Sequence, residues 1–97
     1  MQAWQVYLEE LRQRIPDGTG DIYGREQLIS EAAHDAYQRA SDRMTRDHGW
    51  EDERTLVVMR GLNAAVKEWI GRGDSSWDTL GDDMQRREAE ATNGITS

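Results

Sequence analysis

The sequence contains no cysteine and no phenylalanine, and its single proline is Pro16. Without cysteine the chain cannot form disulfide bonds, thiolate nucleophiles, or cysteine-based zinc and iron–sulfur sites. Its bulky apolar side chains are therefore Leu, Ile, Val, Met, three Tyr and four Trp, and hydrophobic residues make up only 36% of the 97 residues. A core built from this supply is thin. We expect part of the apolar surface to be hidden by a partner protein or by self-association as a homodimer.

Long hydrophobic segments are also absent. No stretch approaches the ~18 apolar residues that a membrane span requires, so we expect no membrane partner. The N-terminal residues, Met1–Gln5, have neither the basic region nor the apolar region of a signal peptide. These observations predict a cytoplasmic protein.

Acidic residues outnumber basic ones by 19 to 12, which gives a net charge of −7. The excess is concentrated toward the end of the chain, because residues 74–97 carry six acidic and two basic residues, whereas residues 51–73 carry four of each. Contacts to phosphate need clustered Lys and Arg, so this balance argues against nucleic acid as a direct ligand. It favours a protein partner with a basic surface.

Apolar residues recur at helical spacing in three long segments, which predict helices over residues 3–15, 24–47 and 52–70. On the outer side of the second segment, Asp42 and Arg46 are one turn apart and are expected to attract each other. The third segment has the broadest apolar arc, which is typical of the central helix of a bundle. A glycine inside it, Gly61, is expected where another backbone crosses closely.

A fourth helix is expected to be shorter. Trp77, Leu80 and Met84 form a narrow apolar stripe that does not continue further, so residues 91–97 are predicted to be a flexible polar tail. No segment shows the strict alternation of a surface strand. The predicted fold class is therefore all-α: a compact bundle of three main helices plus a shorter C-terminal helix, in a single domain over residues 1–90.

The loop after the first helix resembles an EF-hand calcium loop. In a twelve-residue frame from Ile15 to Glu26, Asp17 takes the third place, Gly20 the sixth and Glu26 the twelfth. The first place of such a loop is usually an Asp ligand, and here it is Ile15. In the alternative interpretation the segment is an ordinary corner between helices, in which Asp21 caps the next helix.

A second candidate metal set lies on the second helix. Glu31, His34 and Asp35 are within one turn of each other, as in half of a helical carboxylate metal site, but no matching set occurs elsewhere. No serine stands in a nucleophile signature. We therefore predict no catalytic residue, no metal ligand and no cofactor. A metal-binding helical protein or small enzyme, using the Asp17–Glu26 loop or the Glu31/His34/Asp35 face, is the alternative.

The candidate binding residues are two tryptophans, each set among acidic side chains. An aromatic ring that supplies burial, beside acids that select a basic partner, is typical of a protein-interface anchor. In the other interpretation each tryptophan covers a helix end and the thin core. The two clusters consist of Trp50, Glu51, Asp52 and Glu53, and of Trp77, Asp78, Asp82 and Asp83.

These observations favour a protein–protein interaction module, not an enzyme, that acts as a regulator or inhibitor of its partner. Phage-encoded inhibitors of host defence, of the anti-CRISPR or anti-restriction type, share this physical description, and some use acidic side chains to block a nucleic-acid-binding surface. A net charge of −7 with twelve interspersed basic residues is modest for mimicry by a whole surface. Any mimicry is expected to be local, through the two acidic clusters.

Overall fold

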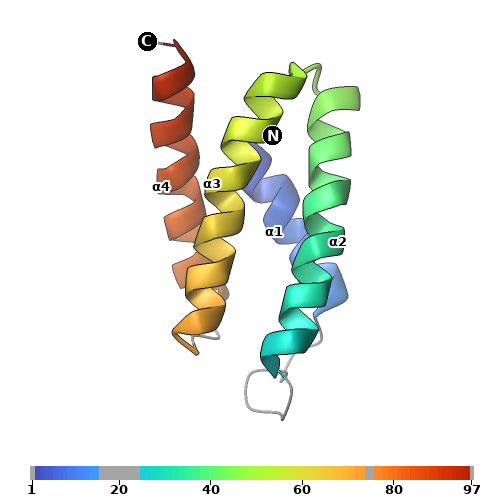
Figure 1. Ribbon diagram of the computed structural model, residues 1–97, viewed down its shortest axis with the longest axis vertical. Helices are drawn as coiled ribbons and strands as arrows, with labels where there is room; N and C mark the ends of the chain where they lie inside the picture. The colour runs from blue at the N-terminus through green and yellow to red at the C-terminus, as the bar shows by residue number, and fades with distance from the viewer. Residues whose placement is uncertain (1, 16–24, 74–75, 97) are drawn as a thin grey trace.

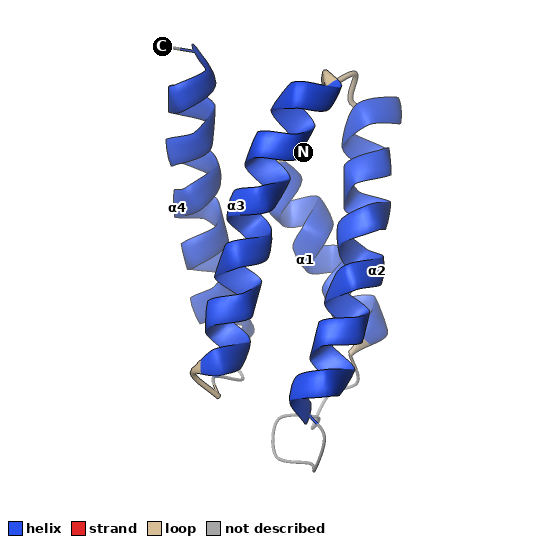
Figure 2. Ribbon diagram, in the orientation of Figure 1, coloured by secondary structure: helices blue, strands red, loops and turns tan. Residues whose placement is uncertain are grey.

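The computed structural model describes residues 2–15, 25–73 and 76–96. Within these residues the chain forms four helices and no strand (Figures 1 and 2). The all-α bundle predicted from the sequence is confirmed. The helices are α1 (Ala3–Arg14), α2 (Arg25–Arg46), α3 (Asp52–Gly71) and α4 (Trp77–Thr96).

Successive helices run in opposite directions along the long axis of the molecule (Figure 1). In the described part of the chain, α1 and α3 each contact all three other helices, whereas α2 and α4 lie on opposite sides of α3 and do not contact each other. The third helix therefore lies between α2 and α4, as expected of a central helix with a broad apolar arc. The first helix lies behind the space between α3 and α2 (Figure 1). No helix of the described residues is long and apolar enough to cross a membrane.

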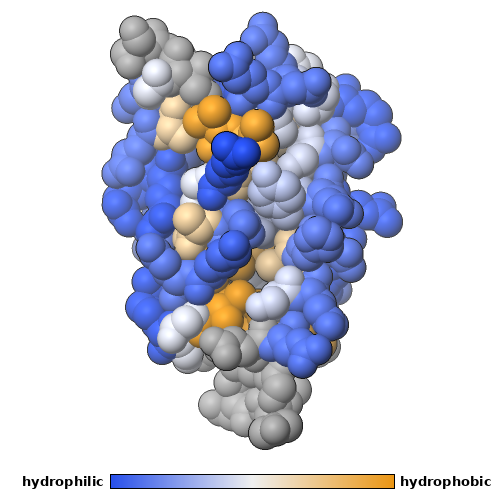
Figure 3. All heavy atoms as spheres, in the orientation of Figure 1, coloured by the Kyte–Doolittle hydropathy of each residue, from blue (hydrophilic) through white to orange (hydrophobic). Residues whose placement is uncertain are grey.

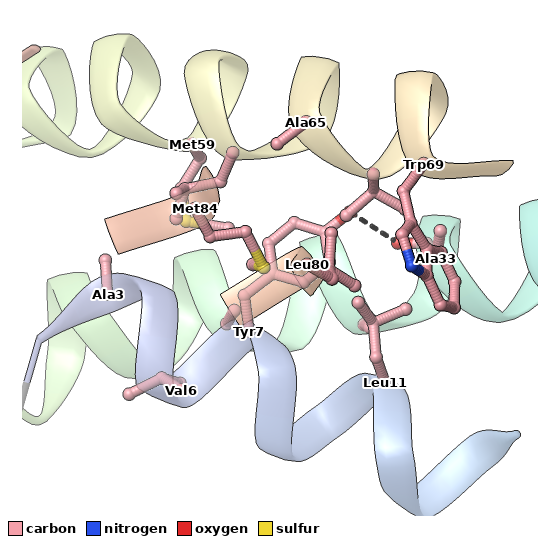
Figure 4. Packing of buried hydrophobic residues seen from close by; sticks show 14 of the residues in the cluster. Ala3, Val6, Tyr7, Leu11, Ala33, Met59, Ala65, Trp69, Leu80 and Met84 are labelled. Carbon is pink, nitrogen blue, oxygen red and sulfur yellow. Dashed lines mark hydrogen bonds between the residues drawn. The ribbon is translucent and has the colours of Figure 1, made fainter. Parts of the chain in front are cut away.

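The core lies between α1, α3 and α4 and extends to the small residues of α2 (Figure 4). Alanines on α2 let it pack closely against α1. There the hydroxyl of Tyr7 donates to the carbonyl of Ala33 at 3.3 Å. The largest fully buried side chains are Trp69, Tyr7, Leu11, Ile29, Met44, Met59, Leu62, Leu80, Met84, Val6, Val58 and Val66.

The prediction of a shorter fourth helix is wrong. Helix α4 has 20 residues, as many as α3, and continues to Thr96. Its inward face does not end at Met84, because Glu88 is buried one turn further on and Ala91 packs against the core after it. A carboxylate at an inward position interrupts the apolar stripe without interrupting the helix. The flexibility expected for residues 91–97 stays a prediction.

The buried carboxylate of Glu88 holds the start of α1. The N–H groups of Gln5 and Val6 donate to the carbonyl of Gln2, but the first two N–H groups of the helix have no such acceptor. They donate instead to Glu88, with the N–H of Ala3 at 3.2 Å and that of Trp4 at 2.6 Å. Burial raises the pKa of Glu88 above its usual value, and these two bonds act in the opposite direction. A residue of α4 therefore serves as the cap of α1.

Side chains of α1 pack over Gly81, whereas no close helix crossing occurs at Gly61. A methyl group at Gly81 would lie 3.5 Å from Cδ2 of Leu8 and 3.7 Å from the ring of Trp4, which are ordinary contact distances. A methyl group at Gly61 would meet nothing within 4 Å. The crossing predicted at Gly61 is therefore wrong, and Gly61 is a helix-interior glycine without a packing role in the monomer.

Replacing Gly61 with alanine is expected to stabilise the protein by ~0.5–1 kcal/mol, because alanine loses less backbone entropy in a helix and the added methyl group meets no atom. Urea unfolding at low protein concentration measures the change. Gly49→Ala is the matched control and should destabilise the protein, since Gly49 has a φ of 69°. A loss of stability in Gly61→Ala would contradict the open environment described.

Replacing Glu88 with alanine should destabilise the protein by about 2 kcal/mol, because the N–H groups of Ala3 and Trp4 lose their acceptor. Urea unfolding followed by circular dichroism measures this loss. Glu90→Ala serves as the control. Glu90 is exposed on the same helix and has a long 3.5 Å contact to Arg86, so its replacement should change stability little. Equal effects of the two substitutions would show that Glu88 does not cap α1.

Candidate functional site

Trp50 lies in the connection between α2 and α3. The positive φ of Gly49 ends α2, and the N–H of Trp50 donates to the carbonyl of Met44 at 3.0 Å. The ring is half-buried against the core, and the guanidinium of Arg54 lies 4.0 Å from its centroid. Trp50 therefore covers the end of the core beneath a cation, and a role in binding a partner stays a prediction.

The three acids after Trp50 are all exposed at the start of α3. Asp52 and Glu53 occupy the first turn of the helix, where negative charge is favoured by the partial positive charge of the N-terminus. Glu51 precedes them, and its carbonyl accepts a hydrogen bond from the hydroxyl of Thr55 at 3.1 Å. Asp52 and Glu53 therefore stabilise the N-terminus of α3, and all three carboxylates remain exposed to solvent.

Trp77 lies at the opposite end of α3, at the start of α4. Its ring is half-buried against Trp69, with 5.2 Å between the ring centroids, and the guanidinium of Arg12 lies 5.7 Å from the centroid of Trp77. The buried ring of Trp69 donates from Nε1 to the carbonyl of Ser76 at 3.1 Å. This tryptophan also covers a helix end, with a basic side chain over it.

The acids near Trp77 are of two kinds. Asp78 and Asp82 are exposed on α4, but the side chain of Asp83 is only 14% exposed. Asp83 pairs with Arg86 and with Nε of Arg87 at 3.2 Å, while Arg87 also reaches Glu68 on α3. Partial burial acts to raise the pKa of Asp83, but hydrogen bonds and positive charge from the two arginines outweigh it and hold that pKa below its usual range. Asp83 therefore helps to join α4 to α3.

The structure does not bring the two predicted clusters together. They lie at opposite ends of α3, whose 20 residues span ~30 Å at the usual rise of an α-helix. A single partner contact of ordinary size therefore could not be centred on both clusters.

A shallow groove of about 340 Å³ lies between α2 and α3, close to the Trp50 end. Asp42 contributes a carboxylate from α2, and Asp52 contributes one from α3. Tyr37 and Leu56 supply its apolar walls. The remaining lining residues are Ser41, Thr45 and Thr55. We call this hollow the acidic groove.

Asp42 is a site residue that the sequence interpretation missed. The sequence predicts an attraction between Asp42 and Arg46, whereas the structure pairs Arg46 with Asp47 at 3.6 Å. Neither Asp42 nor Asp52 forms an ion pair with any other described residue. Two unpaired carboxylates on facing helices, above apolar walls, can receive a cationic side chain.

A second hollow of about 370 Å³ continues along the α2–α3 groove, with Tyr37 shared between the two. Some of its polar groups have polar neighbours, whereas Lys67 is exposed and forms no ion pair with another described residue. His34 lies 3.3 Å from the side-chain nitrogen of Gln38, and Oδ1 of Asn63 lies 3.3 Å from the hydroxyl of Tyr7, whose proton it shares with the carbonyl of Ala33. This part of the groove therefore presents mainly apolar surface.

The residues of the alternative metal interpretation are placed only in part. Glu31, His34 and Asp35 are exposed on α2, and Oε1 of Glu31 accepts a long hydrogen bond from Gln27 at 3.4 Å. Across residues 2–15, 25–73 and 76–96, no group of three or more His, Asp or Glu side chains is arranged to hold a metal ion. The side chains of the calcium-like loop after Ile15, through Glu26, lie outside the described residues.

The outer face of α3 exposes apolar side chains next to the acidic groove. Leu56 is 45% exposed and Val57 is 42% exposed, although the sequence pattern places Leu56 on the main apolar face of the helix. In Figure 3, which views this side of the molecule, separate groups of apolar atoms lie along the front face and are divided by polar side chains. The apolar arc of α3 is thus broader than the other three helices cover.

Comparison with known proteins supplies no relative, since no family model, no curated protein and no solved structure matches the chain.

Replacing Asp83 with asparagine should lower the stability of the protein in a pH-dependent way. Because the pKa of Asp83 is lowered in the folded state, its stabilising contribution is present above the usual pKa range of Asp and is lost as pH falls through the lowered value. Urea unfolding from pH 7 to pH 3 should show the largest difference between wild type and variant at neutral pH. Asp82→Asn, at an exposed neighbouring position, should show little difference at any pH, and a constant difference for Asp83→Asn would contradict the ionic contact.

Proposed function

We propose that the protein is not an enzyme but a regulator or inhibitor that binds a basic segment of another protein in the acidic groove. The observation that supports this most directly is the placement of two unpaired carboxylates, Asp42 and Asp52, beside Tyr37 and Leu56. The groove combines negative charge with apolar walls, which is the combination that a basic side chain matches.

The aliphatic stem and the guanidinium of an arginine side chain each match groups that line this groove. Its aliphatic stem can lie along Leu56, and its planar guanidinium can stack on the ring of Tyr37 while it donates hydrogen bonds to a carboxylate. A lysine can place its ammonium between Asp42 and Asp52 but cannot stack in the same way. We therefore expect arginine to be preferred over lysine.

Charge around the groove supports encounter with such a partner. Glu51 and Glu53 are exposed beside Asp52, and the whole chain carries a net charge of −7. Complementary charge raises association rates and selects against acidic surfaces more than it raises affinity. The hollow beyond Tyr37 offers further area for apolar residues flanking the arginine, and Lys67 in its lining disfavours a second basic residue there.

An inhibitor that occupies an arginine-rich surface also keeps nucleic acid from that surface. A phage-encoded inhibitor of the anti-CRISPR or anti-restriction type would act in this way. The placement of the acids supports local contact over imitation of a continuous phosphate backbone. The Trp50 and Trp77 clusters are at opposite ends of α3, and Asp83 is already paired with Arg86 and Arg87.

The variant Asp42→Asn/Asp52→Asn should weaken binding of an arginine-containing peptide roughly tenfold or more, because both carboxylates that face the guanidinium are neutralised. The probe is a short acetylated peptide with one arginine between small apolar residues, titrated into ¹⁵N-labelled protein. Shifts of the amide signals of Tyr37 and Leu56 report the site, and circular dichroism confirms that the helices are intact.

The matched control is Asp35→Asn/Asp82→Asn, which makes the same change in net charge at exposed positions outside the groove. It should bind the peptide almost as wild type does. Equal weakening in both double variants would show that only net charge matters and would contradict a site in the groove. Affinity purification from the source cell with the same three proteins then identifies the partner, whose capture should be lost only with the groove variant.

A further inference from the structure

The outer face of α3 exposes apolar side chains that no other described helix covers. Leu56 and Val57 are adjacent, are 45% and 42% exposed, and lie near the N-terminal third of the helix. Ala64, two turns further on the same side, is half-exposed. In the described part of the chain no other helix lies over this face, since α1 lies behind the space between α3 and α2, and α2 and α4 are at the sides of α3.

Opposite charges stand on either side of this apolar pair. Glu53 and Arg60 are seven residues apart, so they lie on the same face of the helix two turns from each other, with Leu56 and Val57 between them. Both are exposed, and neither forms an ion pair with another described residue. The face therefore has an acidic end, an apolar centre and a basic end.

We propose that this face packs antiparallel against the same face of a second copy of the chain, about a two-fold axis that passes between Leu56 and Val57. That axis places Glu53 of each copy opposite Arg60 of the other, and Leu56 of each copy opposite Val57 of the other. The contact is self-complementary, as a two-fold interface must be. Both charges and both apolar side chains find partners in the same arrangement.

The charges disfavour two alternative arrangements of the same face. A parallel pairing places Glu53 against Glu53 and Arg60 against Arg60. An antiparallel pairing centred on Arg60 brings the two copies of that arginine together, although it joins Glu53 to Lys67. Like charges in direct opposition disfavour these registers, so the axis between Leu56 and Val57 is selected.

The dimer goes beyond the function proposed above and does not depend on it. The acidic groove lies on the α2 side of α3 and shares Leu56 with the dimer face, whereas Asp42 and Asp52 are not used in the dimer contact. Because Leu56 takes part in both contacts, dimer formation and peptide binding in the groove compete for this side chain. The contact along one helix is small, so we expect self-association in the micromolar range.

The test exchanges the two charges. Glu53→Arg and Arg60→Glu should each weaken self-association roughly tenfold or more, because each places like charges opposite one another twice. A mixture of the two variants should form a dimer again, since one copy then presents two arginines and the other two glutamates. The double variant Glu53→Arg/Arg60→Glu should dimerise as wild type does. Analytical ultracentrifugation over a dilution series from high micromolar to nanomolar measures the association.

Asp35→Arg and Arg39→Glu are the matched controls. They make the same exchanges on the exposed side of α2 and should leave the dimer unchanged. Recovery in the mixture cannot arise from misfolding, so it separates the charge contact from a loss of structure. A wild-type chain that is monomeric at all concentrations would overturn the proposal, as would single variants that dimerise normally or a mixture that stays monomeric. Asp42 and Asp52 are retained in all these variants, and self-association and peptide binding are measured separately, so a failure of the dimer is distinguished from a failure of the groove.

Discussion

One buried carboxylate closes the bundle. Glu88 accepts the two N–H groups at the start of α1 that no carbonyl of the same helix can reach, and it does so from the middle of α4. Without this acceptor the start of α1 would leave polar groups in an apolar setting. With it, α1 lies against α4 closely enough for Leu8 and Trp4 to reach Gly81, and the side chains of α1 complete the core beneath α3. The burial of Tyr7, Leu11 and Met84 follows from that placement.

Much of the fold could be predicted from the sequence, because apolar spacing and helix-ending residues are local signals. The first three helices begin and end within a residue or so of their predicted bounds, and Gly49 ends α2 with the positive φ that a glycine permits. The length of α4 could not be predicted in this way. Its inward stripe passes through Glu88, and a sequence pattern cannot distinguish a glutamate that caps another helix from one that faces water.

The candidate site was less accessible to sequence analysis, for a related reason. Asp42 and Asp52 are ten residues apart on two different helices, so no spacing rule links them, and only the packing of α2 against α3 places both in one groove. Conversely, Asp78, Asp82 and Asp83 are close in sequence, yet Asp83 is held by Arg86 and Arg87.

The number of acidic residues therefore overestimates the negative charge that is exposed and unpaired on the surface of the protein. Glu10 gives a second example, since it is buried between Arg14 and Arg43, which donate to it at 2.6 and 3.1 Å. Burial acts to raise its pKa, but the two arginines keep that pKa below its usual value. Glu10 joins α1 to α2 through Arg43, and Asp83 holds Arg87 beside Glu68 of α3, so the charge of both acids is neutralised within the fold.

The contact between α1 and Glu88 also sets an order of events during synthesis. Its two hydrogen bonds join residues 84 and 85 positions apart, so the acceptor for α1 is synthesised after α1, α2 and α3. Helices α2 and α3, joined by a short connection, can pair before α4 exists. The nascent chain therefore carries α1 without its Glu88 acceptor, and with its α4-facing side uncovered, until α4 has been made.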